Sequence, residues 1–277
     1  MNFIAHITDN LPTFLGIGAQ KAGTTWLYEM LKKHPEICVP SQVKELMFFD
    51  VQKNYSSLGI EGYLSYFHNC DGNRHKAIGE ITPGYLWTAP FCKEKYAISQ
   101  FRINTPKRVY ENLGSSIKLI VLLRNPVKRA VSAYLHHLYK KRYSLNESIL
   151  DIGQRHGIIH MGFYYRHLIH WMKYFPLTSF NIAIYEQVTK NKNDYLKNLF
   201  DFLGVDREYI PPDQNKRYQK KFDYEHKTDG IYIIQNTQKT KVVSRDELKA
   251  LYEIFEEDIF KLKKDFGLDV SEWAAPL

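Results

Sequence analysis

Cysteine is scarce in this sequence of 277 residues, which holds only Cys38, Cys70 and Cys92. The three are far apart and odd in number, and none has a CxxC or Cys/His ligand spacing, so neither a disulfide framework nor a zinc site is predicted. No run approaches about 18 apolar residues, which argues against a membrane-spanning helix. The opening segment, MNFIAHITDNLPTF, lacks the basic and apolar regions of a signal peptide. We therefore expect reduced thiols and a cytoplasmic protein without membrane contact.

Long basic runs are also missing, although the chain carries 38 Lys and Arg against 30 Asp and Glu, a net charge of +8. The densest basic stretch, KRYQKK at 216–221, is too short for a nucleic-acid-binding arm. We therefore expect no nucleic-acid partner, and the charge favours a small anionic ligand. Hydrophobic residues at 44% and charged residues at 25% are the balance of a globular protein with a packed core.

Short apolar runs alternate with helical patterns along most of the chain. This order is typical of an α/β fold with a central, mainly parallel sheet flanked by helices. The run IKLIVLL is nearly continuous and β-branched, as in strands covered on both faces. Residues 50–75 are polar and show no clear element. We predict strands over 13–17, 37–39, 77–82, 117–123 and 180–185, and helices over 25–34, 106–114, 126–142, 162–174, 192–203 and 244–266.

Residues 205–243 are polar, basic and rich in turn signals. This composition fits either a lid or a disordered linker. We favour a lid that covers a substrate, because aromatic and apolar residues such as Tyr218, Phe222 and Tyr224 interrupt the polar sequence. The rest of the chain shows no repeat or boundary, so residues 1–277 are taken as one domain.

The segment GAQKAGTTWL, residues 18–27, has the composition of a phosphate-binding loop. Gly18 and Gly23 permit a tight backbone path, and the amides of the helix that follows hold anions well. In P-loop triphosphatases the lysine directly follows the second glycine and the next hydroxyl binds Mg²⁺. Here Thr24 stands in that place and Lys21 lies inside the loop. We predict a nucleotide phosphate site without a metal; the alternative is a glycine-rich turn without a ligand.

A second candidate site lies in VLLRNPVKRAVSAYLHHL, residues 121–138. Arg124 falls at the carboxyl end of the strongest strand, and Ser132 falls on the helix that follows. An arginine offers a two-pronged fork to a phosphate, and a nearby hydroxyl adds a hydrogen bond. Each residue alone is more simply a surface arginine or a helix-face serine. Together they predict a second phosphate site beside the first, because ligands of open α/β sheets bind at the carboxyl ends of strands.

In these two segments the chain resembles sulfotransferases that use 3′-phosphoadenosine 5′-phosphosulfate (PAPS) and release adenosine 3′,5′-bisphosphate (PAP). The segments KELMFFD (44–50), GEITPGYL (79–86) and GFYYRHLIHWMKYF (162–175) are similar to the heparan-sulfate-type branch and its bacterial relatives. The resemblance covers roughly residues 13–205. It implies a P-loop-like, three-layer α/β domain, PAPS as the sulfuryl donor, and no metal.

The resemblance also implies roles at the donor. Lys21 would contact the 5′-phosphate and the bridging oxygen, while Arg124 and Ser132 would hold the 3′-phosphate. Trp26 matches a position that packs against adenine in cytosolic members; the alternative is a core tryptophan. Lys239 and Lys241 fall where the family closes over the nucleotide, although the family's Lys-Gly pattern is absent. The implied donor-binding set is Gln20, Lys21, Ala22, Gly23, Thr24, Thr25, Trp26, Arg124, Ser132, Lys239 and Lys241.

Glu45 matches the carboxylate general base of the glycan branch; the alternatives are a surface glutamate paired with Lys44 and, as in cytosolic relatives, a histidine base. The chain departs from heparan-type enzymes at two positions on the acceptor side. Met47 replaces a histidine, and Ile81 replaces a lysine. We therefore expect a small-molecule acceptor, with a hydroxyl or amine of a metabolite favoured over a heparan-like glycan. A P-loop kinase and a non-enzymatic binder of nucleotides or anionic glycans are the remaining alternatives.

Overall fold

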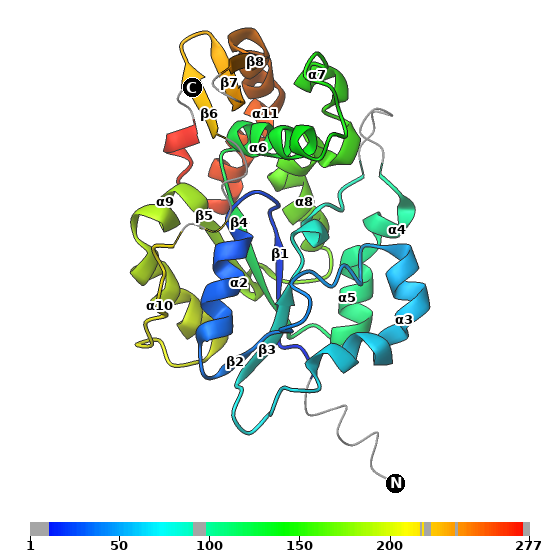
Figure 1. The fold of residues 1–277 in the computed structure, drawn as a ribbon. Helices are drawn as coiled ribbons and strands as arrows, with labels where there is room; N and C mark the ends of the chain where they lie inside the picture. The colour runs from blue at the N-terminus through cyan, green and yellow to red at the C-terminus, as the bar shows by residue number, and fades with distance from the viewer. Residues whose placement is uncertain (1–10, 91–97, 217, 219–222, 236–237, 274–277) are drawn as a thin grey trace.

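Five parallel strands form the centre of the molecule, in the order β2-β3-β1-β4-β5 (Figure 1). The computed structural model describes residues 11–90, 98–216, 218, 223–235 and 238–273. Every residue of β1 and β3 is buried, as expected for inner strands of a sheet covered on both faces. The strands are β1 (Phe14–Gly18), β2 (Ile37–Cys38), β3 (Ala77–Ile81), β4 (Lys118–Leu123) and β5 (Phe180–Ile184).

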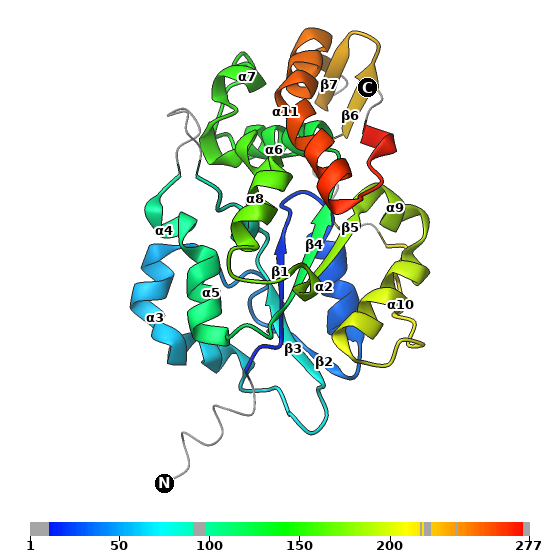
Figure 2. The same ribbon diagram turned by 180° about the vertical axis from the view of Figure 1, so that it is seen from behind.

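Helices cover this sheet on both faces, so the predicted three-layer α/β fold is confirmed. Helix α2 lies in front of the sheet in Figure 1, and α8 lies in front of it in the reverse view of Figure 2. Among the described ranges, none of the helices combines the length and apolarity that crossing a bilayer demands. The α-helices are α2 (Thr24–Lys33), α3 (Gln52–Leu64), α4 (Gln100–Ile103), α5 (Thr105–Leu113), α6 (Pro126–Tyr139), α7 (Ile149–Ile152), α8 (Tyr164–Trp171), α9 (Tyr185–Lys190), α10 (Lys192–Leu203) and α11 (Arg245–Phe266).

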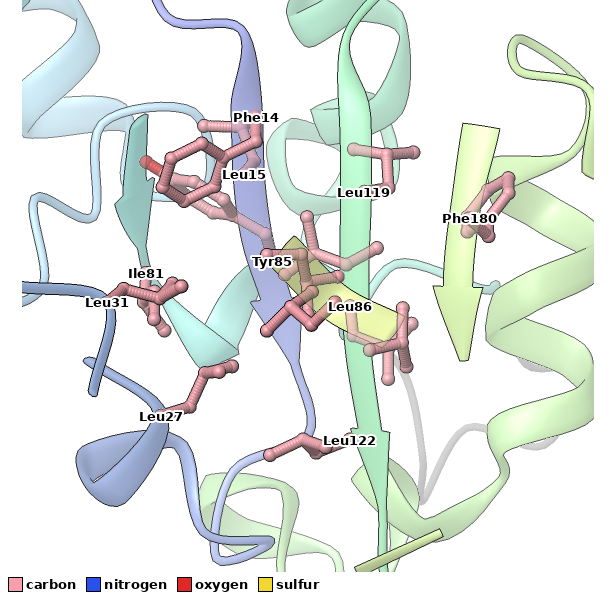
Figure 3. Packing of buried hydrophobic residues seen from close by; sticks show 14 of the residues in the cluster. Phe14, Leu15, Leu27, Leu31, Ile81, Tyr85, Leu86, Leu119, Leu122 and Phe180 are labelled. Carbon is pink, nitrogen blue, oxygen red and sulfur yellow. The ribbon is translucent and has the colours of Figure 1, made fainter. Parts of the chain in front are cut away.

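The main core forms where α2 packs on the sheet (Figure 3). Leu27 and Leu31 share one face of α2, as their i, i+4 spacing requires, and both are fully buried. The backbone of β1 also approaches its neighbours closely. A Cβ at Gly18 would lie 2.6 Å from Leu86, so only glycine fits where β1 enters the loop. This close packing fixes the position of the loop that follows β1.

The structure differs from the sequence-based prediction at several elements, among them α4, α7 and α9, which were not predicted. Residues 52–64 form α3, although no element was predicted there; its polar composition and the left-handed Gly59, with φ of 62°, weaken the helical pattern. Helix α6 ends at Tyr139 and not near residue 142. Residues 223–244 form a three-stranded antiparallel sheet, although no strands were predicted there, and the role of this segment as a substrate-covering lid stays a prediction.

This second sheet consists of β6 (Asp223–Lys227), β7 (Gly230–Gln235) and β8 (Gln238–Ser244). Ile231 and Val243 are fully buried and belong to one apolar cluster with Val131 of α6 and Phe255 of α11. In Figure 1 the sheet accordingly lies beside α6 and α11, near the carboxyl ends of the central strands. The segment is therefore anchored over the edge of the sheet where the donor loop lies.

Cys38 and Cys70 form a disulfide, which overturns the prediction of reduced thiols. Their Cα atoms are 5.7 Å apart, across a sequence separation of 32 residues. Sequence spacing did not indicate this bond because the two cysteines are brought together only when β2 and the end of the α3 region fold onto the sheet. Disulfides persist in oxidising compartments, so the thiol argument for a cytoplasmic location no longer holds, and that location stays a prediction. Cys92 lies outside the described residues.

Replacing both Cys38 and Cys70 with alanine is expected to lower the free energy of unfolding by about 3–4 kcal/mol, because the bond closes a loop of this length in the unfolded chain. Urea denaturation of the oxidised wild type and the double variant measures the difference. Adding a reductant should destabilise the wild type by a similar amount and leave the variant unchanged. An equal loss in both proteins on reduction would contradict the assignment.

Candidate active site

The loop between β1 and α2 carries the first predicted phosphate site. Lys21 and Gly23 both adopt left-handed backbone conformations, with φ of 69° and 92°. A Cβ at Gly23 would also lie 2.8 Å from the Tyr185 ring, so glycine is required there on two grounds. Of the described side chains, none caps the first turn of α2, which leaves amide donors available to an anion. Of the other loop residues, Ala22 and Thr24 are buried, and Gln20 and Thr25 are half-buried.

Arg124 connects this loop with the second predicted phosphate site. It follows β4, which pairs directly with β1. Its Nη1 donates a hydrogen bond to the carbonyl oxygen of Lys21, at 3.1 Å. Its Nε is buried and has no hydrogen-bond partner among the described residues. Because a guanidinium has five N–H donors, Arg124 keeps donors for an oxyanion while it is held against the loop.

A small pocket lies beside Arg124, between α6 and the second sheet. Ser132 lines it, at one turn's distance from Lys128 on the same face of α6, and its contact with a phosphate stays a prediction. From the opposite side the pocket is lined by Tyr224 and His226 of β6. Its wall is completed by Val131, Leu135 and Ile231. The pocket thus combines an arginine, a lysine, a hydroxyl and an imidazole, which is the chemistry of a phosphate site.

Lys128, Tyr224 and His226 were missed in the sequence. Lys128 was detectable, because it precedes Ser132 by four residues on a predicted helix. Tyr224 and His226 were not, because their common direction depends on the period-two geometry of a strand that was not predicted. Partial desolvation, together with the charges of Lys128 and Arg124, lowers the pKa of His226, so the imidazole is neutral at pH 7.

The structure does not bring Lys239 and Lys241 into this pocket. Both lie on β8, where Lys239 pairs with Glu225 at 2.9 Å and Lys241 pairs with Asp229. Their ammonium groups are thus engaged by carboxylates of the same small sheet. Their contact with the nucleotide stays a prediction, and the pocket contains side chains of β6 in their place.

Trp26 lies on α2 and faces α10. Its Nε1 donates to the carbonyl oxygen of Gln214 at 2.8 Å, and its ring centroid is 6.2 Å from that of Tyr195. This position ties α2 to α10 and to the segment after it. Packing against adenine stays a prediction.

Glu45 lies on the other side of the donor loop, in the irregular segment before α3. Its Oε1 accepts a hydrogen bond from Lys44 Nζ at 2.9 Å, and the same Nζ donates to Thr25 Oγ1 at 2.9 Å. The side chain of Glu45 is 41% exposed and that of Lys44 is 26% exposed. The candidate base is therefore accessible to an acceptor and is linked through one lysine to the donor loop.

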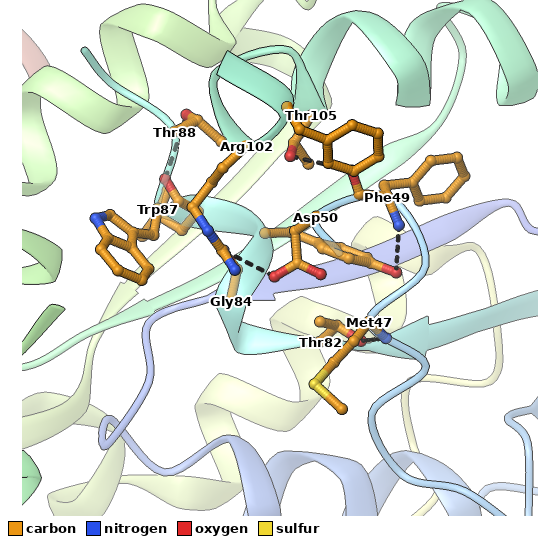
Figure 4. Close-up of polar contacts among 12 residues, drawn as sticks. Met47, Phe49, Asp50, Thr82, Gly84, Trp87, Thr88, Arg102 and Thr105 are labelled. Carbon is orange, nitrogen blue, oxygen red and sulfur yellow. Dashed lines mark hydrogen bonds and ion pairs between the residues drawn. The ribbon is translucent and has the colours of Figure 1, made fainter. Parts of the chain in front are cut away.

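Two further carboxyl groups, Asp50 and Glu80, lie near enough to Glu45 for its charge to contribute to their raised pKa values, and Figure 4 shows Asp50 beside Arg102. Asp50 is buried and forms an ion pair with Arg102 at 2.8 Å; burial raises its pKa, and the Arg102 charge opposes that rise. Glu80 is fully buried and accepts a hydrogen bond from Thr82 at 2.7 Å. Burial raises the pKa of Glu80 to about 8, with the charges of Asp50 and Glu45 as smaller contributions in the same direction. Glu80 is therefore protonated at neutral pH and does not compete with Glu45 as a base.

Across the described ranges, no group of three or more His, Cys, Asp or Glu side chains is arranged to hold a metal ion. The site as built offers amides, Lys21 and Arg124 to a phosphorylated donor on one side of β1. On the other side it offers an accessible carboxylate. This combination suits transfer of a group from an anionic donor to an acceptor that must lose a proton.

Comparisons with known proteins agree with this geometry. The family model described as "Sulfotransferase domain" matches residues 11–250. Heparan sulfate glucosamine 3-O-sulfotransferase 5 of Mus musculus is 27% identical, over 94% of this chain and 70% of its own length. The bifunctional heparan sulfate N-deacetylase/N-sulfotransferase of Drosophila melanogaster is 30% identical, over 71% of this chain and 20% of its own length. The crystal structure of a sulfotransferase from Alicyclobacillus acidocaldarius has the same fold, with a TM-score of 0.68 and 22% identity over 95% of this chain and 99% of that one.

Proposed function

We propose a function from one premise: the chain belongs to the sulfotransferase domain family. It is accordingly a PAPS-dependent sulfotransferase that releases PAP. The observation that carries the residue assignments is the hydrogen bond from Arg124 to the Lys21 carbonyl. This bond makes the loop and the Arg124 pocket contiguous, as one nucleotide with phosphates at both its 5′ and 3′ positions requires.

The reaction is an in-line transfer of the sulfuryl group. The acceptor oxygen or nitrogen attacks sulfur, the bond from sulfur to the bridging oxygen breaks, and its electron pair stays on the 5′-phosphate of PAP. Glu45 takes the acceptor proton. Lys21 and the amides at the start of α2 stabilise the charge that grows on the departing phosphate, an effect that needs no rearrangement of the site during the step.

The acceptor that we propose is a small molecule with a hydroxyl or amine group. Polyanionic glycans are held by several cations, and among the cations described near the base, Lys44 is already paired with Glu45. Asp50 already holds Arg102, Ile81 is fully buried and apolar, and Met47 is 43% exposed. The surface next to Glu45 is therefore suited to a neutral or weakly charged acceptor.

A glucosamine-containing glycan is the second candidate. It is supported by the likeness over 94% of the chain to a heparan sulfate glucosamine 3-O-sulfotransferase. The two candidates share the donor site and the base, and they differ only in what lies against Glu45.

Radiolabelled PAPS offered to a panel of small alcohols, phenols, amines and glycans, with the labelled products identified by mass, tests the proposal. Transfer to small acceptors with little transfer to heparan-type chains supports the first candidate, and the reverse supports the second. Phosphoryl transfer from ATP, with no turnover of PAPS on any acceptor, would overturn the function altogether.

Replacing Arg124 with alanine is expected to weaken PAP binding by roughly 10- to 100-fold, because a charge-assisted hydrogen bond contributes about 1.5–3 kcal/mol. Titration calorimetry with PAP measures the change. Arg74→Ala provides the matched control, because Arg74 is exposed in a turn before β3 and belongs to neither predicted phosphate site. Equal affinities for wild type and Arg124→Ala would show that the 3′-phosphate binds elsewhere.

A further inference from the structure

We propose that Lys44 is a further catalytic residue, whose ammonium group contacts the phosphosulfate of the donor while it orients Glu45. This inference rests on the proposed function, since it assigns a role within the same transfer step. In the sequence analysis Lys44 enters only as the ion-pair partner of Glu45, in the alternative in which Glu45 is a surface residue. The structure places it between the two halves of the site.

The position of Lys44 is defined by two hydrogen bonds of one nitrogen. Its Nζ lies 2.9 Å from Thr25 Oγ1, in the first turn of α2 directly after the donor loop, and 2.9 Å from Glu45 Oε1. An ammonium group has three N–H donors, so these two bonds leave one. With 26% of its side chain exposed, Lys44 is neither a solvated surface lysine nor sealed from a ligand.

The segment that carries Lys44 is fixed to the end of β3. The amide of Met47 donates to Thr82 Oγ1 at 3.2 Å, and the amide of Phe48 donates to the Tyr85 hydroxyl at 3.0 Å. Asn54 of α3 adds a hydrogen bond to the Met47 carbonyl at 3.1 Å. These contacts hold the backbone just after Glu45, so the reach of Lys44 to the loop follows from the fold.

The chemistry of the transfer needs a cation at this place. Negative charge grows on the phosphate side as the sulfur–oxygen bond breaks, and Thr25 lies in the first turn of α2, which binds this phosphate in the proposed function. β3 supplies no cation here, because it ends in the buried Ile81, and Arg102 is engaged by Asp50. Lys44 is thus placed to stabilise the negative charge on the departing phosphate from the acceptor side, together with Lys21.

The same contact orients the base. While Lys44 holds Oε1 of Glu45, the second carboxylate oxygen remains available for the acceptor proton. A donor bound at Thr25 would be linked to Glu45 through a single ammonium group. The residue therefore couples occupation of the donor site to the geometry of proton transfer.

The competing explanation is an ordinary ion pair, which changes stability and activity little. Lys33 provides a matched control on the same helix as Thr25. Its side chain is 24% exposed and pairs with Asp213 at 3.4 Å, and its Nζ also donates to the Pro212 carbonyl at 2.8 Å. Lys33 lies at the opposite end of α2 from the loop, so Lys33→Met removes a comparable pair without touching the site.

The test compares wild type, Lys44→Met, Lys44→Arg and Lys33→Met by steady-state kinetics, by titration calorimetry with PAP, and by thermal unfolding. We expect Lys44→Met to lower kcat about 10²-fold and to weaken PAP binding roughly 10-fold. Lys44→Arg, which keeps the charge, should recover part of both losses and also serves if the methionine variant does not fold. Lys33→Met should retain the kcat and PAP affinity of the wild type.

Two results would overturn the inference. A kcat for folded Lys44→Met within about threefold of wild type would remove the catalytic role. A large loss of kcat with unchanged PAP affinity would remove the donor contact and leave Lys44 as a positioning residue for Glu45. Neither result contradicts the proposed function if the wild type binds PAP and transfers the sulfuryl group. A wild type that does neither would refute the proposed function itself.

Discussion

Glu45→Gln is expected to lower kcat by about 10²- to 10⁴-fold, the usual contribution of a positioned general base. Glutamine keeps the size of the side chain and can still hydrogen-bond to Lys44, but it cannot accept the acceptor proton. PAP affinity should stay within about twofold of the wild type, because Glu45 lies on the acceptor side of the loop. Initial rates at saturating PAPS and calorimetry with PAP separate the two effects.

Glu61→Gln is the control for this change. Glu61 is an exposed residue of α3, so its variant should retain the kcat of the wild type. A Glu45→Gln enzyme with more than about a tenth of wild-type kcat would reject the carboxylate base and return attention to a histidine base or to a non-enzymatic role for the chain.

Lys21→Ala is expected to lower kcat by about 10²- to 10³-fold, as when one preorganised donor is removed from a developing oxyanion. Lys21 is held in a left-handed conformation, with φ of 69°, and its carbonyl is bound by Arg124. This geometry places the lysine within the loop that faces the leaving phosphate. The effect should fall mainly on kcat, because the charge that Lys21 neutralises grows in the transition state.

Lys53→Ala, at an exposed position of α3, controls for the loss of one positive charge from a basic protein. If Lys21→Ala raised KM for PAPS and left kcat intact, Lys21 would serve binding alone, and the function of a lysine inside the loop would need another explanation.

Much of the central sheet could be predicted from the sequence, because its strands are short apolar runs bounded by clear stop signals. The last helix was predictable as well, because Ser244 and Glu247 form a capping box at its start and Gly267 ends it in a left-handed conformation. Helix α3 could not be predicted, because it buries little and contains two glycines. The strands β6 to β8 were missed for a related reason. Their apolar residues are buried against α6 and α11, and this packing between distant segments could not be predicted from the sequence.

The candidate site was predictable where it depends on one loop or one helix. Lys21, Thr25, Arg124 and Ser132 each lie in a local motif. The structure places Lys21 and Arg124 after the neighbouring strands β1 and β4, and Thr25 and Ser132 on the helices that follow. Groups that depend on distant segments were not predictable. His226 reaches the pocket from β6, and Glu80 is recognised as neutral only from its complete burial. The disulfide of Cys38 and Cys70 belongs to the same class, since its two ends meet only in the folded chain.

The residues assigned to the donor nucleotide and those assigned to the acceptor come from different segments of the chain. Residues assigned to the nucleotide lie in the loop after β1, on α2, directly after β4 and on α6, whereas Glu45, which is assigned to the incoming substrate, lies in the segment before α3. Lys44 joins these two groups of residues through its hydrogen bonds to Thr25 and Glu45. We therefore expect an exchange of residues 38–87 with those of a related enzyme to change the choice of acceptor, and both cysteines of the disulfide, Cys38 and Cys70, lie within the exchanged segment.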